Sequence, residues 1–384
     1  MSIDYCKTPF PWFGGKTDAA PHVWEALGDV AHYVEPFFGG GAVLLRRPHP
    51  CNRMHHSETV NDANGLLINA WRAIQMHPEA TAEAASWPVA EADLMARHLA
   101  LLRWQREHEL ERLMADPEFC DPRIAGWWLW GVCSWIGSGW CDGSGPWIVG
   151  TDGRVTKRTG SGGAIRQLPY VADNGRGVNH PGLREPGVSA GTPERSWETG
   201  DFHPMTMPEL LAWFRFLSAR LRHVRILHGD WTRALGTGVT FTLDVRMKQG
   251  VCGVFLDPPY SAEAGRDMGL YAVESGSVAH DVRAWCLANG NDRRLRIVLA
   301  GFAGEGHEEL ESHGWRSVSW FKDGHLKGGM RNQRKQRKES TDGDTGNTGK
   351  AHQQHRERLW LSPHCLERAT EPGLFDSLLD AGEP

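Results

Sequence analysis

The sequence predicts an α/β protein in which strands and helices alternate near both ends of the chain, with a long interruption between them. Three features predict this class. Residues 32–45 form the pattern of a strand, a glycine turn and the start of a helix. Residues 253–256 are a short apolar run, typical of a buried strand, that stops at Asp257 and two prolines. The alternation of helix and strand returns at Thr206 and continues to about residue 300.

The composition is that of an ordinary globular protein, with 40% apolar and 23% charged residues among 384. The eight cysteines include no C-x-x-C pair, so we expect reduced thiols and no structural zinc. No apolar run approaches about eighteen residues, and the first residues lack the order of a secretory signal. A cytoplasmic protein without a membrane span is therefore expected. Since the net charge is −5, any contact with nucleic acid requires local basic clusters.

The N-terminal segment contains two glycine clusters. Residues 11–16, with the sequence P-W-F-G-G-K, are expected to open a helix that runs to about Leu27. A strand at 32–37 then leads into a second cluster at 39–41. Such a turn lets the backbone approach a nucleotide-like ligand closely. The pattern is not G-x-G-x-x-G, so a dinucleotide site is not predicted.

The next predicted strand ends in an acid, Asp62, within residues 58–64. In nucleotide-binding α/β folds, an acid at the end of the second strand typically holds ribose hydroxyls. Asp62 could equally be the N-cap of a helix at 63–75. The two roles are compatible, and position alone does not choose between them.

Residues 76–220 interrupt the alternation. Residues 91–115 have helical periodicity, and residues 123–136 form a tryptophan-rich apolar helix that we expect to be a buried satellite core. Residues 137–200 are rich in Gly, Pro, Ser, Asn and Arg and predict a long loop region. Its scattered arginines and tryptophans suit contact with phosphates and bases, and a merely solvated loop explains them equally well.

The C-terminal part has a regular order of elements. A capping box at 206–209 predicts a helix to about 221, and a turn containing Asp230 follows the strand after it. The further elements expected are strands at 224–227, 251–256 and 295–300, a helix at 278–289, and a hairpin of 315–321 with 358–361. The hairpin connection, 322–355, is basic and is expected to be a mobile loop that either contacts phosphates or is solvated.

The segment Asp257-Pro258-Pro259-Tyr260 ends the most apolar strand. The two prolines make the exit from this strand stiff and remove two N–H donors. An acid, two rigid carbonyls and an aromatic ring at the carboxyl edge of a sheet are suited to grip a planar group that donates hydrogen bonds. The alternative is a simple strand-ending turn, where Asp and Pro are common.

Four segments in this order resemble the Dam-like (D12 class) DNA adenine-N6 methyltransferases, and phage-encoded members especially: W-F-G-G-K at 12–16, V-E-P-F-F-G-G-G at 34–41, N-D at 61–62 and D-P-P-Y at 257–260. The resemblance implies a Rossmann-like S-adenosylmethionine (SAM) methyltransferase fold, with a seven-stranded, mostly parallel sheet whose last strand is antiparallel. Residues 1–75 and 221–362 would form the catalytic domain. Residues 76–220 would be an inserted helical and loop-rich target-recognition region, and 363–384 a tail.

The resemblance also implies SAM as cofactor, duplex DNA as partner and no metal. The residues expected to bind the cofactor are Trp12, Lys16, Glu35, Pro36, Phe37, Gly39, Gly41, Asp62, Asp230 and Asp257. The residues expected to hold the adenine amine and ring are Asp257, Pro258, Pro259 and Tyr260. The residues expected to contact DNA phosphates are Lys335, Arg337 and Lys338. One departure is the F-F-G-G-G turn, where the family more commonly has F-x-G-x-G. An N4-cytosine methyltransferase, an RNA or protein methyltransferase and an inactive DNA-binding relative stay as alternatives.

Overall fold

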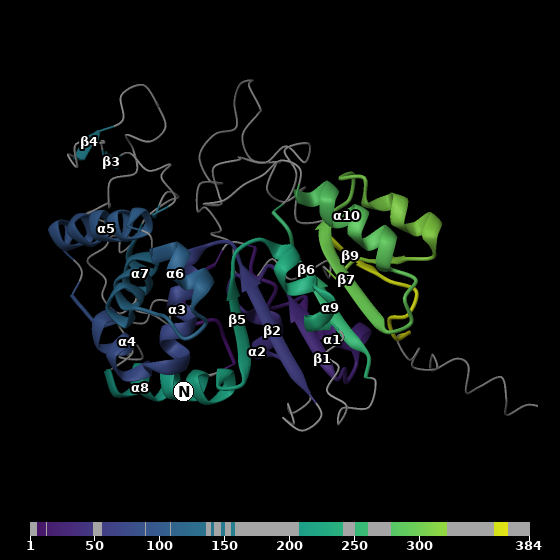
Figure 1. Cartoon of the computed structure of the whole chain (residues 1–384), viewed down its shortest axis with the longest axis horizontal. Helices are drawn as coiled ribbons and strands as arrows, with labels where there is room; N and C mark the ends of the chain where they lie inside the picture. The colour runs from purple at the N-terminus through teal and green to yellow at the C-terminus, as the bar shows by residue number, and fades with distance from the viewer. Residues whose placement is uncertain are drawn as a thin grey trace, which may run out of the picture.

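The computed structural model describes residues 6–12, 14–48, 56–88, 90–107, 109–135, 140–141, 147–149, 155–157, 207–240, 250–259, 278–320 and 357–367. Its centre is a seven-stranded sheet with the order β5-β2-β1-β6-β7-β9-β8 (Figure 1). The strands are β1 (His32–Glu35), β2 (Ser57–Asp62), β5 (Val224–His228), β6 (Cys252–Leu256), β7 (Leu295–Phe302), β8 (Arg316–Val318) and β9 (Glu357–Leu361). All neighbours pair in parallel except β9, which is antiparallel to both β7 and β8. The predicted fold class is confirmed.

Both faces of the central strands β1, β6 and β7 are buried, as expected for parallel strands. Successive residues of β6 show this, because Phe255 packs in one core cluster while Val254 and Leu256 pack in another. The first cluster includes apolar residues of α1 (Ala20–Leu27), α2 (Ala42–Leu45) and α3 (Gly65–Met76). The second includes those of η3 (Trp231–Leu235) and α10 (Val278–Asn289). The two short elements α9 (Thr237–Thr240) and η5 (His307–His313) complete the C-terminal part.

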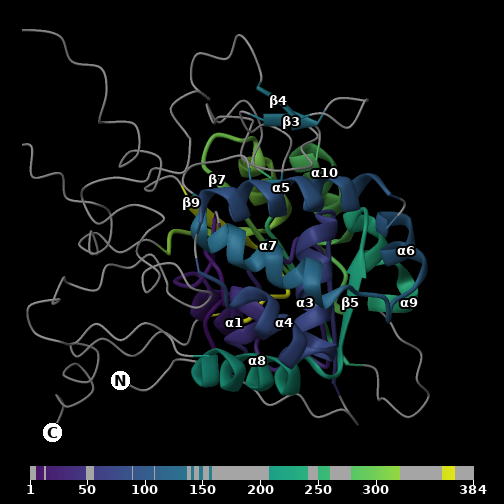
Figure 2. The ribbon, with the colours of Figure 1, turned by 90° about the vertical axis from the view of Figure 1, so that its left-hand side faces the viewer.

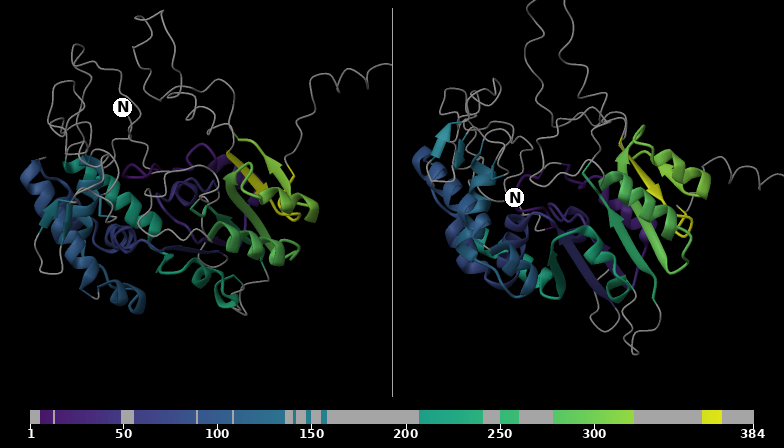
Figure 3. Two further views of the ribbon diagram at one scale, coloured as in Figure 1. Left: turned by 90° about the horizontal axis from the view of Figure 1, so that it is seen from above. Right: turned by 45° about the horizontal axis from the view of Figure 1, so that its top comes forward.

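The chain between α3 and β5 forms helices that lie beside the β5 edge of the sheet (Figures 1 and 2). They are α4 (Pro78–Ala85), α5 (Glu91–Arg106), α6 (Glu109–Ala115), α7 (Pro122–Ser134) and α8 (Met207–Leu221). Helix α7 packs against α3, α4 and α5, and α8 packs against α3 and α4. The left view of Figure 3 shows the same arrangement from above, with these helices beyond the β5 edge of the sheet and α10 toward its other end.

The tryptophan-rich helix α7 contributes to two cores. Trp128 belongs to the main core, together with residues of α1 and α3. Trp130 and Trp135 form a separate small cluster with Leu94 of α5. The expected satellite core is therefore limited to these last two tryptophans. A short antiparallel hairpin of β3 (Trp147–Val149) and β4 (Val155–Lys157) also lies in a stretch where the sequence predicted only loops.

Two helix starts differ from the sequence prediction. Helix α1 begins at Ala20 instead of near Pro11, with Pro21 in its first turn, where proline is well tolerated. Gly14 has a φ of 72°, outside the helical region. Helix α3 is capped by Asn64, whose side chain accepts a hydrogen bond from the Leu67 backbone N–H at 3.1 Å. The alternative role of Asp62 as helix N-cap was therefore wrong.

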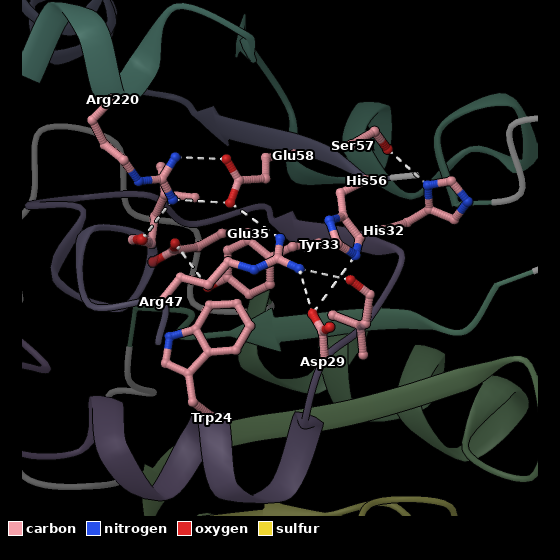
Figure 4. A network of polar contacts seen from close by, with 12 residues as sticks. Trp24, Asp29, His32, Tyr33, Glu35, Arg47, His56, Ser57, Glu58 and Arg220 are labelled. Atoms are coloured by element: carbon pink, nitrogen blue, oxygen red, sulfur yellow. Dashed lines mark hydrogen bonds and ion pairs between the residues drawn. The ribbon is translucent and has the colours of Figure 1, made fainter. Parts of the chain in front are cut away.

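A buried ion-pair network near the amino end of β2 joins this strand to α8 and to the segment after α2 (Figure 4). Glu58 of β2, only 2% exposed, accepts hydrogen bonds from Arg47 at 3.1 Å and from Arg220 of α8 at 2.7 and 2.9 Å. The Arg47 guanidinium also lies over the Trp24 ring, 5.3 Å from its centroid. One carboxylate thus holds α8 and the segment after α2 against β2.

In the described part of the chain, no helix is long and apolar enough to cross a membrane.

Candidate active site

Strand β6 ends at Leu256, and Asp257 follows it at the carboxyl edge of the sheet. The Nζ atom of Lys16 lies 2.9 Å from Oδ2 of Asp257, with the two side chains 5% and 20% exposed. Lys16 also donates a hydrogen bond to the Gly14 carbonyl oxygen at 2.8 Å. The W-F-G-G-K and D-P-P-Y segments, far apart in the chain, therefore meet through an ion pair. The sequence singled out both side chains but did not predict their contact.

The glycine turn after β1 adopts a conformation that only glycine takes readily. Gly39 and Gly41 have φ angles of 47° and 68°, in the left-handed region. A Cβ atom on Gly39 would lie 2.5 Å from Nε1 of Trp12, and one on Gly41 would lie 2.9 Å from the Phe38 ring. The Gly39 carbonyl oxygen accepts a hydrogen bond from Trp71 Nε1 at 3.0 Å. The turn is thus held closely from both sides by aromatic side chains.

Trp12 is placed by an aromatic cluster as well as by this turn. Its ring centroid lies 6.0 Å from that of Phe10 and 6.3 Å from that of Trp128 on α7. The Thr8 side-chain hydroxyl donates a hydrogen bond to the Gly40 carbonyl oxygen at 2.7 Å and holds the same N-terminal segment against the turn. The N-terminal motif therefore supports the glycine turn directly, whatever ligand it binds.

Asp62 at the end of β2 is half-buried and receives two backbone hydrogen bonds. Its Oδ2 accepts from the Gly39 N–H at 3.0 Å, and its Oδ1 accepts from the Asn64 N–H at 2.9 Å. Burial raises the pKa of Asp62 to about 6, although these N–H groups oppose the rise. A carboxylate can accept further hydrogen bonds, so Asp62 retains acceptor capacity for a ligand at this edge.

Glu35, the last residue of β1, lies in the protein interior. It is 2% exposed, and the Tyr33 hydroxyl donates a hydrogen bond to its Oε2 at 2.9 Å. Burial raises the pKa of Glu35 well above its usual range, and the nearby charge of Asp257 adds to this rise. The Tyr33 hydrogen bond lowers it only in part. The carboxyl group of Glu35 is therefore buried, close enough to Asp257 to be affected by its charge.

The turns that follow β1 and β5 come together through aromatic stacking. The rings of Phe37 and Trp231 have centroids 6.0 Å apart and an interplanar angle of 24°. Asp230, just before Trp231, caps the short helix η3, because its Oδ1 accepts from the Thr232 N–H at 2.9 Å and from the Thr232 hydroxyl. Asp230 is exposed at this edge, next to the Phe37–Trp231 pair.

The structure thus brings most of the predicted site residues to one edge of the sheet, at the ends of β1, β2, β5 and β6. Tyr260, Lys335, Arg337 and Lys338 lie outside the described residues. Within the described residues, no group of three or more His, Cys, Asp or Glu side chains is arranged to hold a metal ion. Asn61 also belongs to this edge, although the sequence analysis assigned it no role. The available signal was its place in the N-D segment that ends β2.

Comparison with known proteins agrees with the geometry. Residues 12–94 match the family model of the D12 class N6 adenine-specific DNA methyltransferases. The resemblance seen in the sequence is confirmed. A Type II methyltransferase of Lactococcus lactis subsp. cremoris is 33% identical over 69 residues, which are 18% of this chain and 22% of that protein. A DNA N-6-adenine-methyltransferase of Escherichia phage P1 is 30% identical over 74 residues, or 19% of this chain and 9% of that protein.

The D12 match covers the glycine turn, β2 and α3, but not the Asp257 segment. The chain matches less than a quarter of the length of either of the two relatives. Asp257 after β6 and Trp231 after β5 therefore belong to the candidate site through their contacts alone, with Lys16 and with Phe37.

Proposed function

We propose that this protein is a SAM-dependent DNA methyltransferase that modifies the N6 amine of adenine. The Lys16–Asp257 ion pair is the observation that carries the proposal. It joins a residue of the D12-matched segment to the D-P-P-Y segment outside the match. The two segments then share the sheet edge at which open α/β proteins bind their ligands.

The residues at this edge fit a SAM molecule by their chemistry. Asp62, with its remaining acceptor capacity, would hold the ribose hydroxyls. The glycine turn 39–41 offers backbone at close range for the methionine portion, and Phe37 and Asp230 would border the adenine. Trp12, Lys16 and Pro36 would contact the cofactor from the segments on either side. Bound SAM supplies an activated methyl group together with its leaving group.

The exocyclic amine of adenine is a poor nucleophile, because its lone pair is delocalised into the ring. We propose that the Asp257 carboxylate and the Pro258 carbonyl accept hydrogen bonds from the two N6 hydrogens and hold the nitrogen in line for attack. Pro259 keeps this segment stiff, and Tyr260 would stack on the base. Orientation and local electrostatics then supply most of the rate. An adenine within a duplex must first be flipped out, at a cost of a few kcal/mol that stacking and hydrogen bonds offset.

A direct test offers the purified protein labelled SAM with duplex DNA, RNA and protein in parallel. The expected result is label in DNA only, recovered after digestion as N6-methyladenosine. Recovery of N4-methylcytosine would identify the alternative amine, which the same geometry can hold. Label in RNA or protein would contradict DNA as the substrate. No SAM binding in calorimetry would instead identify an inactive DNA-binding relative.

The raised pKa of Asp62 makes a prediction for pH. Asp62 is neutral below its pKa of about 6 and charged above it. Because the charged form accepts two hydroxyl hydrogen bonds better, SAM affinity should fall by up to about tenfold as the pH falls from 7 to 5. Calorimetric titration with SAM across this range measures the effect. The Asp62→Asn variant should bind more weakly at pH 7 with an affinity that is nearly flat in pH. The same slope in both proteins would show that another group titrates.

The basic run in the hairpin connection makes a prediction for DNA binding. Replacing Lys335, Arg337 and Lys338 together by glutamine should weaken duplex binding and reduce the slope of log affinity against log salt by about 2 to 3. Fluorescence anisotropy at several salt concentrations measures this slope. A matched control replaces three exposed arginines at the amino ends of β5 and β7, away from the candidate site: Arg222, Arg293 and Arg294. If both triple variants behave as the wild type, the run is a solvated insertion.

A further inference from the structure

The Asn61 side chain joins the two turns that border the candidate cofactor site. Its Nδ2 atom donates hydrogen bonds to the Pro36 carbonyl oxygen at 3.2 Å and to the Gly229 carbonyl oxygen at 2.9 Å. Pro36 follows β1 and Gly229 follows β5, while Asn61 belongs to β2, which lies between these strands. A single amide group thus links three adjacent strand ends.

The environment of Asn61 suits an amide better than a carboxylate or an aliphatic side chain. Asn61 is fully buried, at 0% exposure, and both of its partners are carbonyl oxygens that can only accept. The –NH2 group has two protons, one for each carbonyl. An aspartate would place oxygen lone pairs against both carbonyls, and an aliphatic side chain would leave both buried acceptors without this donor.

Backbone hydrogen bonds attach each turn to β2 separately. The Phe38 N–H donates to the Asn61 carbonyl oxygen at 2.9 Å, and the Gly229 N–H donates to the Asp62 carbonyl oxygen at 3.1 Å. These bonds fix each turn relative to β2. The Asn61 amide adds a link that contacts both turns at once, next to the stacked rings of Phe37 and Trp231.

We propose that Asn61 is a positioning residue for the cofactor site. Its amide sets the spacing between the turn after β1 and the turn after β5, and so the geometry of the wall formed by Phe37 and Trp231. The inference rests on the proposed function, since it assumes that SAM occupies the edge between these turns. Because its side chain is fully buried, Asn61 would act on the cofactor through the two turns.

The chain offers a matched control in Asn69 on α3. Asn69 is also fully buried, and its amide exchanges two hydrogen bonds with the backbone of Asp121, at 3.0 and 2.7 Å. It therefore ties α3 to the start of α7 with the same residue type and the same number of bonds. Asn69→Ala and Asn61→Ala should cost comparable stability, because each removes two hydrogen bonds to backbone groups.

Calorimetry with SAM separates a positioning role from a merely structural one. We expect Asn61→Ala to weaken SAM binding by about tenfold or more, and Asn69→Ala to change it by less than about twofold. Hydrogen exchange should speed up in residues 36–41 and 229–235 for Asn61→Ala, and around residue 121 for Asn69→Ala. Asn61→Ser, which keeps one donor, should lie between Asn61→Ala and the wild type, and it carries the test if the alanine variant does not fold.

The possible outcomes are distinct. If the wild type binds SAM and Asn61→Ala or Asn61→Ser binds it equally well, the positioning role is overturned. Equal losses of affinity in Asn61→Ala and Asn69→Ala would overturn it too, since general destabilisation would then explain both. A wild-type protein that binds no SAM would contradict the proposed function, while unchanged exchange in residues 36–41 and 229–235 of Asn61→Ala would overturn the link between the turns independently.

Discussion

Asp257→Ala should abolish methyl transfer, with a loss of roughly a thousandfold or more in rate, while SAM binding is retained at least in part. The substitution removes the carboxylate proposed to accept a hydrogen bond from the adenine amine, and it removes the partner of Lys16 at 2.9 Å. The rate of transfer of labelled methyl groups to an adenine-containing duplex measures the first effect. Calorimetry with SAM measures the second.

Asp292→Ala is the matched control for this experiment. Asp292 is also a partly exposed aspartate in an ion pair, 2.6 Å from Arg294, with 27% of its side chain exposed. It precedes β7, away from the carboxyl ends of the strands, so its loss should leave methyl transfer unchanged. Wild-type turnover by Asp257→Ala would disprove the mechanism. Loss of activity in both variants would show that the assay reports folding and not the site.

Glu58→Ala should destabilise the folded protein by about 3 to 5 kcal/mol. The substitution removes a 2% exposed carboxylate and leaves Arg47, whose side chain is 1% exposed, without its buried counter-charge. It also releases Arg220 of α8 from β2. Because the network lies near the amino end of β2, away from the candidate site at the carboxyl ends of the strands, the effect should be on stability and not on the site. The midpoint of urea unfolding, followed by circular dichroism, measures the change.

The control for Glu58 is Glu79→Ala on α4. Glu79 also pairs with an arginine, Arg215 at 2.8 Å, but both side chains are more than half exposed, at 52% and 59%. Solvent screens this pair, so its loss should cost far less than the loss of Glu58. A cost for Glu58→Ala as small as that for Glu79→Ala would contradict the view that the buried network holds α8 and the segment after α2 to the sheet.

Much of the fold was predictable because its signals are local. The strand β6 was found from its apolar run and the prolines that end it, and helix α10 was predicted at 278–289, the bounds that the structure has. The antiparallel hairpin of β8 and β9 was predicted from two short runs separated by a long basic connection. Each of these elements carries its own pattern of apolar residues and breakers, which acts over a few neighbours.

The errors occurred where partners distant in the chain decide the local conformation. Residues 11–12 and 14–19 are not helical, and this segment is held against the glycine turn by Trp12 and against the end of β6 by the Lys16–Asp257 pair. The cap of α3 is Asn64, and Asp62 is left to accept the Gly39 N–H of the turn after β1. In both cases a tertiary contact outweighed a plausible local signal.

The sequence by itself determined the fold class, the order of the elements and the residue types at the carboxyl edge, since strand runs, glycine turns and prolines act locally. Only the tertiary structure decided how those residues meet. It paired Lys16 with Asp257, and it joined Asn61 to Gly229, 168 residues further along the chain. Contacts of this kind depend on which strands become neighbours in the sheet, and a parallel sheet places next to one another the ends of strands that the sequence keeps far apart.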